Sequence, residues 1–514
     1  MSDRLAPSAR VVVSADFTVG QIDPRLFGSF VEHMGRCVYT GIYEPGHPAA
    51  DIDGFRTDVE ALIDELGPTL VRYPGGNFVS GYTWEDGIGP REERPRRVDY
   101  AWRSIESNQI GVDEFLPWAQ RRGLETMMAV NLGTRGILDA ANLVEYCNVQ
   151  GGTAWSDLRR SNGRQEPYGV TLWCLGNEMD GPWQTGHKTA LEYGRLAAQA
   201  AQVMKAVDPT IKLVACGSSA RDMPTFGEWE STVLDECYDY VDYLSLHAYY
   251  EEWDGDRRRF LESGAELDGF IRDVAATVDA VAARRHSTKR IDLSLDEWNV
   301  WYIANQPKDN PALREAPRLI EDDYSALDAV VVGDLLISMM NNADRVKIGC
   351  QAQLVNVIAP IRTEPGGDAW RMTTFYPFAA AAGQSGATVL HARVDSTSQT
   401  PSGRARVDDV AVAVSETILE AGERELTVFL TNRADSEAVV VVDLLGYGAV
   451  RVVSSMVIES DHAGGRATAA EVLEVAPREL TTCSVTTTGL RVELRPESWS
   501  VITVRAALLP TVTP

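Results

Sequence analysis

Two glutamates stand at the ends of two apolar, strand-like runs. Glu178 closes the run Val-Thr-Leu-Trp-Cys-Leu-Gly-Asn-Glu (170–178), and Glu297 lies near the end of Ile-Asp-Leu-Ser-Leu-Asp-Glu-Trp-Asn (291–299). Two carboxyl groups can break a glycosidic bond with retention, because one protonates the leaving oxygen while the other attacks carbon. An ionisable group directly after an apolar strand emerges at the mouth of a sheet, where α/β folds keep their sites.

Polar side chains occupy the same position, just after a strand-like run, at several other places along the chain. A single histidine there is usually a structural residue, and a single glutamate on a loop is usually solvated. As a set they are harder to explain by packing, since buried carboxylates are costly without a ligand or a task. Beside the two glutamates, the strand-end residues that we expect at a site are Glu32, Arg72, Asn77, Asn177, His247, Tyr249 and Gln353.

The two glutamates need different surroundings. The acid must hold a proton near neutral pH, so its pKa must be raised, whereas the nucleophile must stay ionised. His247 and Tyr249 lie two apart on one strand and therefore on one face, so either could donate a hydrogen bond to Glu297 if the sixth and seventh strands are neighbours. Asn177 could donate its amide to a sugar hydroxyl. Arg72 could hold an adjacent carboxylate, and a purely structural salt bridge is an equally good interpretation.

Tryptophans and a glycine pair mark the loops between these runs. Sugar rings pack their C–H faces on aromatic planes, and concave ligand sites are lined in this way. Of the loop tryptophans at 84, 102, 183, 298 and 301, we expect Trp102 and Trp301 at the site. The run Arg-Tyr-Pro-Gly-Gly-Asn (72–77) predicts a tight turn after a strand, and its two glycines permit positive φ and close approach of the backbone.

Strand and helix patterns alternate from about residue 24 to residue 380. A helix is predicted over 53–67, with an apolar stripe at Val59, Leu62, Ile63 and Leu66 and a stop at Gly67, and another over 327–341. Strands separated by helices imply a parallel sheet. Eight of them predict a (β/α)₈ TIM barrel over residues 18–383, with strands at 26–31, 69–72, 126–131, 170–175, 212–216, 241–247, 291–295 and 345–350.

The alternation of strand and helix patterns ends at about residue 384. Short β-rich runs follow one another, separated by turn-forming clusters such as Pro-Ser-Gly (401–403) and Ala-Gly-Gly (463–465). This spacing predicts an antiparallel, jelly-roll-like β-sandwich over residues 384–514, which the strand-like run 10–14 within residues 1–17 could join. The predicted strands of this region are 387–394, 410–417, 426–431, 438–445, 450–458, 490–494 and 501–504.

Bulk composition narrows the class of protein. The 514 residues carry 48 Lys and Arg against 74 Asp and Glu, a net charge of −26, so nucleic acid is not an expected partner. The seven cysteines are scattered, with no C-x-x-C pair, which favours a reducing compartment. We see no apolar run of signal-peptide or membrane-spanning length, and we therefore expect a cytoplasmic location and no membrane partner.

Motifs for cofactor chemistry are missing from the sequence. The seven histidines are dispersed without H-E-x-x-H, so no metal site is expected. There is no G-x-G-x-x-G and no phosphate loop, so we expect no cofactor. The absence of G-x-S-x-G makes a serine hydrolase an unfavourable interpretation.

Five segments together resemble the α-L-arabinofuranosidases of glycoside hydrolase family 51. The resemblance runs from the first predicted barrel strand to the eighth, whereas the Asn-Glu pair alone would indicate only a wider clan of barrels. The segments are Phe-Gly-Ser-Phe-Val-Glu-His-Met-Gly-Arg (27–36), Arg-Tyr-Pro-Gly-Gly-Asn-Phe-Val-Ser-Gly-Tyr (72–82), Gly-Asn-Glu-Met-Asp-Gly (176–181), Asp-Glu-Trp-Asn (296–299) and Gln-Leu-Val-Asn-Val-Ile-Ala-Pro (353–360).

This resemblance implies a barrel with a C-terminal β-sandwich and a retaining double displacement. Glu178 resembles the acid/base and Glu297 the nucleophile, while Tyr249 resembles the residue that orients the nucleophile. Members of this kind are often intracellular and commonly hexameric. Residues that resemble those holding the arabinose hydroxyls are Glu32, Asn77, Asn177 and Gln353; Arg72 and His247 resemble supporting residues, and Trp102 and Trp301 sit where the family lines its sugar pocket.

The sequence therefore predicts a retaining, exo-acting α-L-arabinofuranosidase that releases terminal arabinofuranose from arabino-oligosaccharides. Two alternatives stay open at this point. One is a different activity of the same site, as a retaining endo-glucanase or β-xylosidase. The other is a carbohydrate-binding protein without turnover, against which the presence of both glutamates argues. The natural polymer and the linkage depend on loop shapes that the sequence does not reveal.

Overall fold

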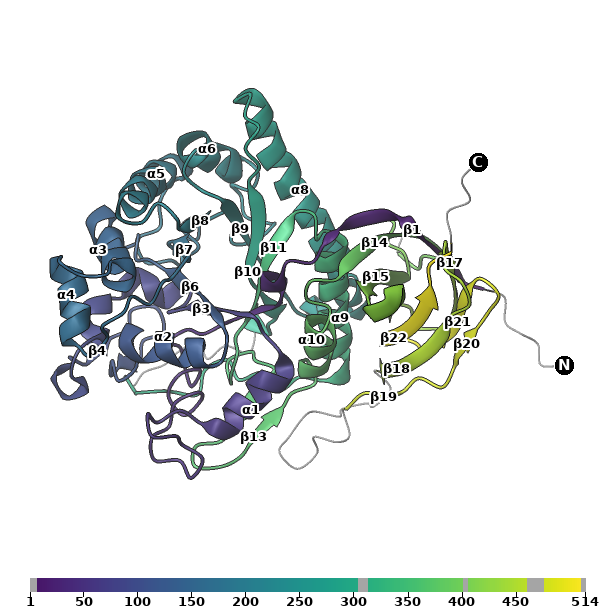
Figure 1. Ribbon diagram of the computed structural model, residues 1–514, viewed down its shortest axis with the longest axis horizontal. Helices are drawn as coiled ribbons and strands as arrows, with labels where there is room; N and C mark the ends of the chain where they lie inside the picture. Colours follow the sequence, from purple (N-terminus) through teal and green to yellow (C-terminus); the bar gives the residue numbers. More distant parts are fainter. Residues whose placement is uncertain (1–6, 304–312, 401–404, 460–475, 510–514) are drawn as a thin grey trace.

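Eight parallel strands close into a barrel, in the order β10-β11-β2-β3-β6-β7-β8-β9. The computed structural model describes residues 7–303, 313–400, 405–459 and 476–509 (Figure 1). All eight predicted strands are present, so the barrel prediction is confirmed. The strands are β2 (Gly28–Phe30), β3 (Leu70–Tyr73), β6 (Glu125–Ala129), β7 (Leu172–Leu175), β8 (Lys212–Ala215), β9 (Tyr243–Tyr250), β10 (Asp292–Val300) and β11 (Val346–Ala352).

Helices cover the outside of the barrel (Figure 1). The predicted apolar stripe of α1 is buried, and Gly67 ends this helix in the left-handed conformation (φ +75°). The helices are α1 (Thr57–Leu66), α2 (Val112–Arg121), α3 (Ile137–Asn148), α4 (Ala154–Ser161), α5 (Ala190–Val207), α6 (Glu228–Cys237), α7 (Arg257–Leu261), α8 (Ser263–Arg284), α9 (Ala326–Asn341) and α10 (Phe375–Ala382). Two short hairpins, β4 (Arg97–Val98) with β5 (Ile105–Glu106) and β12 (Ile361–Thr363) with β13 (Ala369–Arg371), complete the loops.

The C-terminal part of the chain forms one ten-stranded sheet, in the order β19-β18-β22-β16-β15-β14-β1-β17-β21-β20. The N-terminal strand joins it as predicted, between β14 and β17. The strands are β1 (Ala9–Gln21), β14 (Thr388–Ser396), β15 (Val410–Ile418), β16 (Glu423–Asn432), β17 (Ala438–Leu445), β18 (Arg451–Glu459), β19 (Arg478–Glu479), β20 (Cys483–Val485), β21 (Gly489–Leu494) and β22 (Ser498–Ala507).

Two details of this sheet differ from the sequence prediction. The pairing of β1 with β17 is parallel, because β1 enters from the other end of the chain and not through a hairpin. The strands β19 and β20 were not predicted, since two or three residues show no periodicity.

The predicted division at residues 17/18 crosses β1, which extends to Gln21. The division into units of 18–383 and 384–514 with 1–17 stays a prediction.

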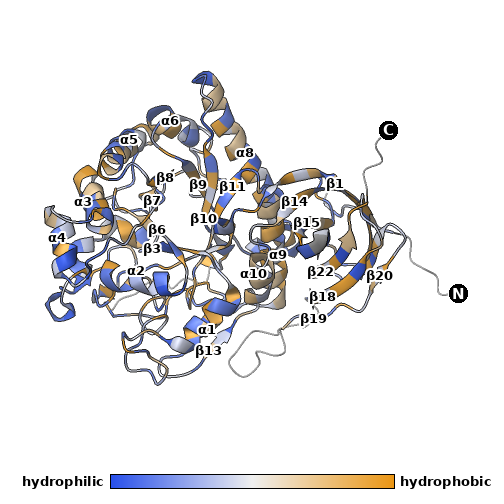
Figure 2. Ribbon diagram, in the orientation of Figure 1, coloured by the Kyte–Doolittle hydropathy of each residue, from blue (hydrophilic) through white to orange (hydrophobic). Residues whose placement is uncertain are grey.

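The ten-stranded sheet encloses a core of its own. In its central strands every second residue is apolar and buried in this core, as in Val440, Val442 and Leu444 of β17 and Leu426, Val428 and Leu430 of β16. The hydropathy colouring shows apolar residues along the strands of this sheet and on the adjoining helices α9 and α10 (Figure 2). The opposite face of β15 and β16 is buried as well, because Ala411, Ala413 and Phe429 belong to the core on the barrel side.

Helix α9 joins the two parts of the molecule. It packs against β10 of the barrel on one side and against β15, β16, β18 and β22 on the other, which explains why it is apolar nearly all round. Packing is so close that a Cβ at Gly333 would lie 2.2 Å from the Trp499 ring. A buried ion pair crosses the same contact, with two bonds of 2.9 Å from Arg433 to Asp334.

In the described parts of the chain, we find no helix that combines the length and the apolar character needed to cross a membrane.

Candidate active site

A β-bulge in β10 brings two consecutive acidic residues to the same side of the barrel wall. The register shifts between Ser294 and Glu297 on the β9 side and between Leu295 and Trp298 on the β11 side. Successive residues of a regular strand point to opposite faces, but a bulge re-aims one of them. Asp296 and Glu297 are consequently both buried, and both face the guanidinium of one arginine of β3.

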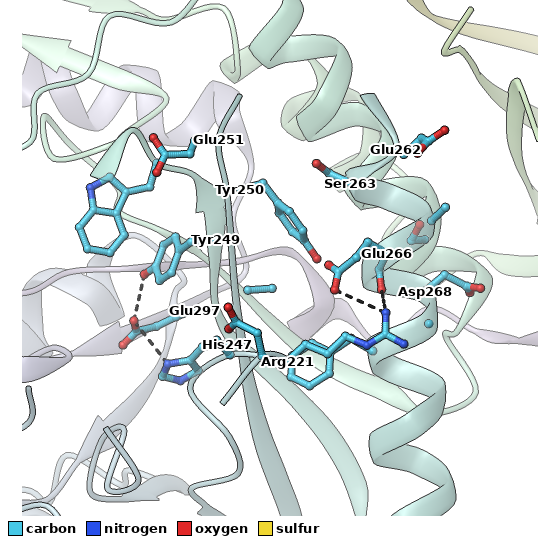
Figure 3. Close-up of a pocket in the computed structure, with 18 of the residues that line it drawn as sticks. Arg221, His247, Tyr249, Tyr250, Glu251, Glu262, Ser263, Glu266, Asp268 and Glu297 are labelled. Atoms are coloured by element: carbon cyan, nitrogen blue, oxygen red, sulfur yellow. Dashed lines mark hydrogen bonds and ion pairs between the residues drawn. The ribbon is translucent and has the colours of Figure 1, made fainter. Parts of the chain in front are cut away.

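Glu297 is held by donors from two other strands. The Arg72 guanidinium donates to Oε1 at 2.7 Å. The Tyr249 hydroxyl donates to Oε2 at 2.9 Å, as Figure 3 shows. Burial raises the pKa of the Glu297 carboxyl, while the positive charges of His247 and Arg72 oppose that rise. Both donors stabilise the ionised form and fix the carboxylate in one orientation.

Glu178 follows β7 in a backbone conformation that is rare for a residue with a Cβ. Its φ is +43°, and Gly176 two residues earlier has φ +93°. Such left-handed residues cluster at active sites, where the surrounding structure holds the strain. The side chain is only 8% exposed, with the Trp183 indole donating to Oε2 at 2.6 Å and His247 Nδ1 lying 2.9 Å from Oε1.

His247 connects Glu178 to the two acidic residues of β10. Its Nδ1 also lies 3.5 Å from Glu297 Oε2, and its Nε2 lies 3.0 Å from Asp296 Oδ1. Burial lowers the pKa of this histidine, but the surrounding carboxylates outweigh burial and raise the pKa well above its usual value. The Asp296 pKa is lowered despite burial, because Arg72 and His247 stabilise its anion. His247 is therefore an imidazolium that donates through both nitrogens.

Glu32 forms another wall of the site, beyond the end of β2. Its Oε1 accepts from the Phe78 backbone N–H and from the Trp102 indole, both at 2.9 Å, and the Gln353 amide nitrogen lies 3.3 Å from Oε2. Burial and the nearby Glu297 carboxylate raise the pKa of Glu32 to about 8. At neutral pH, Glu32 can therefore donate as well as accept a hydrogen bond.

The glycine turn predicted after β3 passes directly against the acidic side chains. Gly75 has φ +133°, and a Cβ there would lie 2.3 Å from Cγ of Glu32. At Gly76 an added Cβ would lie 2.9 Å from Oε1 of Glu297. No side chain fits at either position, so the two glycines allow the turn to form part of the wall, as the sequence predicted.

Two asparagines, Asn77 and Asn177, are linked to Arg72 beside the acidic side chains. Asn177 accepts from the second guanidinium nitrogen of Arg72 at 2.8 Å, and its amide nitrogen lies 3.2 Å from Oδ1 of Asn77. Asn177 thereby has its position fixed by the same arginine that holds Glu297. One buried cation thus sets the spacing between the two sides of the site.

A cavity of 1910 Å³ opens over these side chains. It begins at Glu178 and Glu297, where Trp301 stands edge-on to the Tyr249 ring with 4.9 Å between ring centroids. It continues along the end of β9 toward α8, where Figure 3 places Glu266 beside Arg221. The end at Glu178 and Glu297 is lined by polar and aromatic side chains, and the cavity extends as far as residues of β14 and β15, which leaves room for a ligand larger than one ring.

Three groups of the site converge closely enough to suggest a metal. Ligand atoms of Glu178, His247 and Glu297 all lie within 4.8 Å of one another. A metal-binding histidine must offer a nitrogen lone pair. Both nitrogens of His247 instead face carboxylates, and its raised pKa keeps both protonated, so the cluster fits an imidazolium bound by anions better than a metal centre.

Nine of the eleven sequence-predicted site residues line this cavity, and the other two, Arg72 and Asn177, are buried and bonded to each other beside Glu297. Either His247 or Tyr249 of β9 was expected to donate to Glu297. In the structure Tyr249 does so, whereas His247 lies nearer to Glu178 and Asp296. Two residues of the site were not predicted. Asp296 was hidden by its position beside Glu297, and Trp183 was noticed as a loop aromatic but not chosen.

Comparison with known proteins points to one family over nearly the whole chain. Residues 62–260 match the α-L-arabinofuranosidase 1 domain, and residues 296–498 match the α-L-arabinofuranosidase C-terminal domain. A Streptomyces lividans protein named intracellular exo-α-(1→5)-L-arabinofuranosidase is 52% identical over 500 residues, covering 96% of this chain and 75% of that protein. A Bacillus subtilis relative described in the same terms is 51% identical, covering 97% and 99% of the two chains.

Comparison with solved structures points to the same family as the sequence comparison. A family 51 α-L-arabinofuranosidase from Bifidobacterium longum superimposes with a TM-score of 0.92 at 43% identity, covering 97% of this chain and all of that one. The chain belongs to the family 51 α-L-arabinofuranosidases. An arabinose complex of the Thermotoga maritima α-L-arabinofuranosidase is also similar, with a TM-score of 0.84, 32% identity and the same coverage. In this member of family 51, the carboxyl ends of β2, β3, β7, β9, β10 and β11 supply the site described above.

Proposed function

We propose that this protein is a retaining, exo-acting α-L-arabinofuranosidase that removes terminal, non-reducing arabinofuranose from arabino-oligosaccharides. The observation that carries the proposal is the pair Glu178 and Glu297, whose nearest ligand atoms lie within 4.8 Å of each other across a buried pocket. A short separation favours retention, since inverting enzymes hold their carboxyl groups at roughly 6.5–9.5 Å to admit a water molecule.

In the first step, the Glu297 carboxylate attacks the anomeric carbon of the arabinose. The bond from that carbon to the leaving oxygen breaks, and Glu178 gives its proton to the oxygen. The products are the shortened saccharide and an arabinosyl ester of Glu297. Arg72 and Tyr249 orient the attacking carboxylate before reaction and take up its changing charge, which lowers the barrier by preorganisation.

In the second step, Glu178 is a carboxylate and acts as the base. It removes a proton from a water molecule, the water oxygen bonds to the anomeric carbon, and the ester bond to Glu297 breaks. Two inversions at the same carbon give net retention. The His247 imidazolium stabilises Glu178 in this ionised state, and Asp296 keeps His247 charged.

The remaining polar groups bind the hydroxyls of the arabinose ring. Asn77, Asn177 and Gln353 present amides, and Glu32 presents a carboxyl group that carries a proton at neutral pH. Trp102 is fixed by its bond to Glu32 and forms a side wall, and Trp301 forms another beside Tyr249. A pocket closed on these sides accepts a chain end and favours exo action.

The names of relatives support a finer description. The Streptomyces and Bacillus proteins are named for α-(1→5) linkages, while a Bifidobacterium longum relative at 50% identity is named an exo-α-(1→6)-L-arabinofuranosidase. We favour (1→5)-linked oligosaccharides as substrates, inside the cell, where the first two names place those enzymes. Family resemblance favours a homo-hexamer, which the molar mass in solution from light scattering would test.

The proposal is tested by initial rates on 4-nitrophenyl α-L-arabinofuranoside, β-D-xylopyranoside and β-D-glucopyranoside, for the wild type and Glu297→Ala. A strong preference for the arabinofuranoside that disappears in the variant supports the proposal. Preference for a pyranoside would move the enzyme to the β-xylosidase or glucanase alternative. Absence of turnover on all three would favour the binding-protein alternative.

The mode of action needs a separate measurement. Product sizes from (1→5)-arabinan distinguish exo from endo cleavage, because an exo enzyme releases only arabinose from the start of the reaction. Parallel rates on (1→5)- and (1→6)-linked arabinobiose decide the linkage. Early release of mixed oligosaccharides would contradict the exo assignment.

A further inference from the structure

The two oxygens of Glu178 have different neighbours, and the difference bears on how this residue changes its protonation state. Oε1 lies 2.9 Å from Nδ1 of the buried His247 imidazolium, which donates to it. Oε2 points toward the cavity, where the Trp183 indole donates at 2.6 Å. A carboxyl group that accepts from donors on both oxygens is stabilised as its anion.

The proposed first step requires the opposite state. Glu178 must carry a proton and deliver it to the leaving oxygen, and this proton must sit on the oxygen that faces the substrate. His247 blocks Oε1, so Oε2 carries the proton. The Trp183 indole occupies the hydrogen-bonding position at Oε2 and favours the wrong state for acid catalysis, but the right state for the base of the second step.

The exposed position of Trp183 also allows its indole to move away from Glu178. Its side chain is 53% exposed, whereas Glu178 is 8% exposed. It follows directly on the turn at Gly181, where an added Cβ would lie 2.5 Å from the indole, so only glycine lets the ring fold back over the turn. The ring thus forms part of the open cavity wall and not of the core.

We propose that Trp183 is a movable cap on the acid/base: its indole donates to Oε2 of Glu178, and the leaving-group part of the saccharide displaces it from that oxygen. This inference rests on the proposed role of Glu178. Trp183 acts through Glu178 and is a positioning residue. When the first product departs, the indole returns to Oε2 and stabilises the carboxylate that activates water.

Other titratable groups around Glu178 stay in place when Trp183 is changed. One of these groups lies on the loop of Glu178 itself, and others lie on strands β9 and β10. The Arg72 guanidinium acts on Glu178 indirectly, through its bond to Glu297. These groups are Asp180, His247, Tyr249, Glu297, Asp296 behind His247, and Arg72. A shift in the pH profile on changing Trp183 is therefore assigned to the lost indole bond.

The test is the pH profile of kcat/KM on (1→5)-linked arabinotriose, whose leaving group needs a proton. In Trp183→Phe the aromatic surface remains and the donor is lost, so the anion of the acid is less stable. We expect the alkaline limb of the profile to move to higher pH, because the lost hydrogen bond was made to the ionised carboxylate. The control is Trp253→Phe, a half-exposed tryptophan of the same cavity, in which the limb stays in place.

An unchanged limb in Trp183→Phe, or a rate loss that is equal at all pH values, would overturn the proposal by reducing Trp183 to a packing residue. Failure of the underlying function has a different signature. If Glu178 is not the acid, Glu178→Ala keeps both its turnover of arabinotriose and the alkaline limb, whatever Trp183 does.

Displacement of the indole can be followed separately by tryptophan fluorescence in the inactive Glu297→Ala protein. Arabinotriose, which has a leaving-group part, should change the tryptophan emission. This change should be absent from the double variant that also carries Trp183→Phe. Arabinose alone fills only the part of the cavity at Glu178 and Glu297, and it should leave the emission of Trp183 unchanged. The same change with arabinose as with arabinotriose would contradict displacement by the leaving group.

Discussion

The carboxyl end of the barrel and the interior of the ten-stranded sheet are both buried, but different side chains fill them. The barrel end holds three carboxylates, an imidazolium and a guanidinium within one hydrogen-bonded cluster, made by Glu178, Asp296, Glu297, His247 and Arg72. The core enclosed by the sheet is aliphatic, with Val, Leu, Ile and Ala side chains dominating it.

This difference separates residues that serve reaction from residues that serve stability. Burial of apolar surface stabilises a fold directly, at roughly 25 cal/mol per Å². Burial of charges costs free energy that pairing only partly returns, so a cluster of this kind adds little to stability. Neutralising a carboxylate of the cluster should accordingly alter turnover more than stability, whereas removing a cation that pairs with these carboxylates leaves buried charge unpaired and costs stability as well. Changes in the sheet core should alter stability alone.

The largest effect is expected for Glu297→Gln. Loss of the nucleophile should lower kcat/KM on the arabinofuranoside by roughly 10⁴-fold or more. The urea midpoint should stay the same or rise, because one of three mutually repelling buried carboxylates becomes neutral. A large loss of stability in this variant would show that the cluster holds the barrel together and would break the comparison.

The second effect concerns pH. The raised pKa of His247 means that its contribution to stability is complete below the unfolded value near 6.5 and declines as pH rises toward the folded pKa. His247→Gln, which cannot carry the charge, should lose about 3–5 kcal/mol at pH 6. The difference in urea unfolding free energy between wild type and variant should shrink at pH 9. A difference independent of pH would mean that His247 is neutral in the fold.

A smaller effect, confined to stability, is expected in the sheet. Leu426 of β16 is fully buried, so Leu426→Ala should cost about 2–5 kcal/mol through lost burial and the cavity left behind. The folded variant should keep the wild-type kcat/KM, because Leu426 lies in the core of the sheet and not in the cluster. A reduced kcat/KM at unchanged stability would show that the sheet controls the site.

Much of this arrangement could be predicted because it follows from local periodicity. The barrel strands are apolar runs, the helices between them carry stripes, and the ligand-side residues stand at strand ends by the geometry of the fold. Gly75 and Gly76 were also predictable, since adjacent glycines after a strand signal close backbone approach, and both approach a carboxylate.

What escaped prediction depends on departures from regular geometry. Alternation places Asp296 on the far side of β10 from Glu297, and only the bulge returns it to the site. The bond from Trp183 to Glu178 arises in a loop, where spacing carries no information on direction. The parallel pairing of β1 with β17 joins residues more than 420 positions apart, beyond the reach of any local pattern.

The most direct test of the central claim is the configuration of the products that azide forms with two inactivated proteins. In Glu178→Ala, azide should attack the arabinosyl ester of Glu297 and give the α-L-arabinofuranosyl azide, with retention. In Glu297→Ala, azide should take the place of the missing nucleophile and give the β-azide, with inversion. NMR spectroscopy distinguishes the two anomers. Retention in Glu297→Ala with inversion in Glu178→Ala would exchange the two roles and contradict the account.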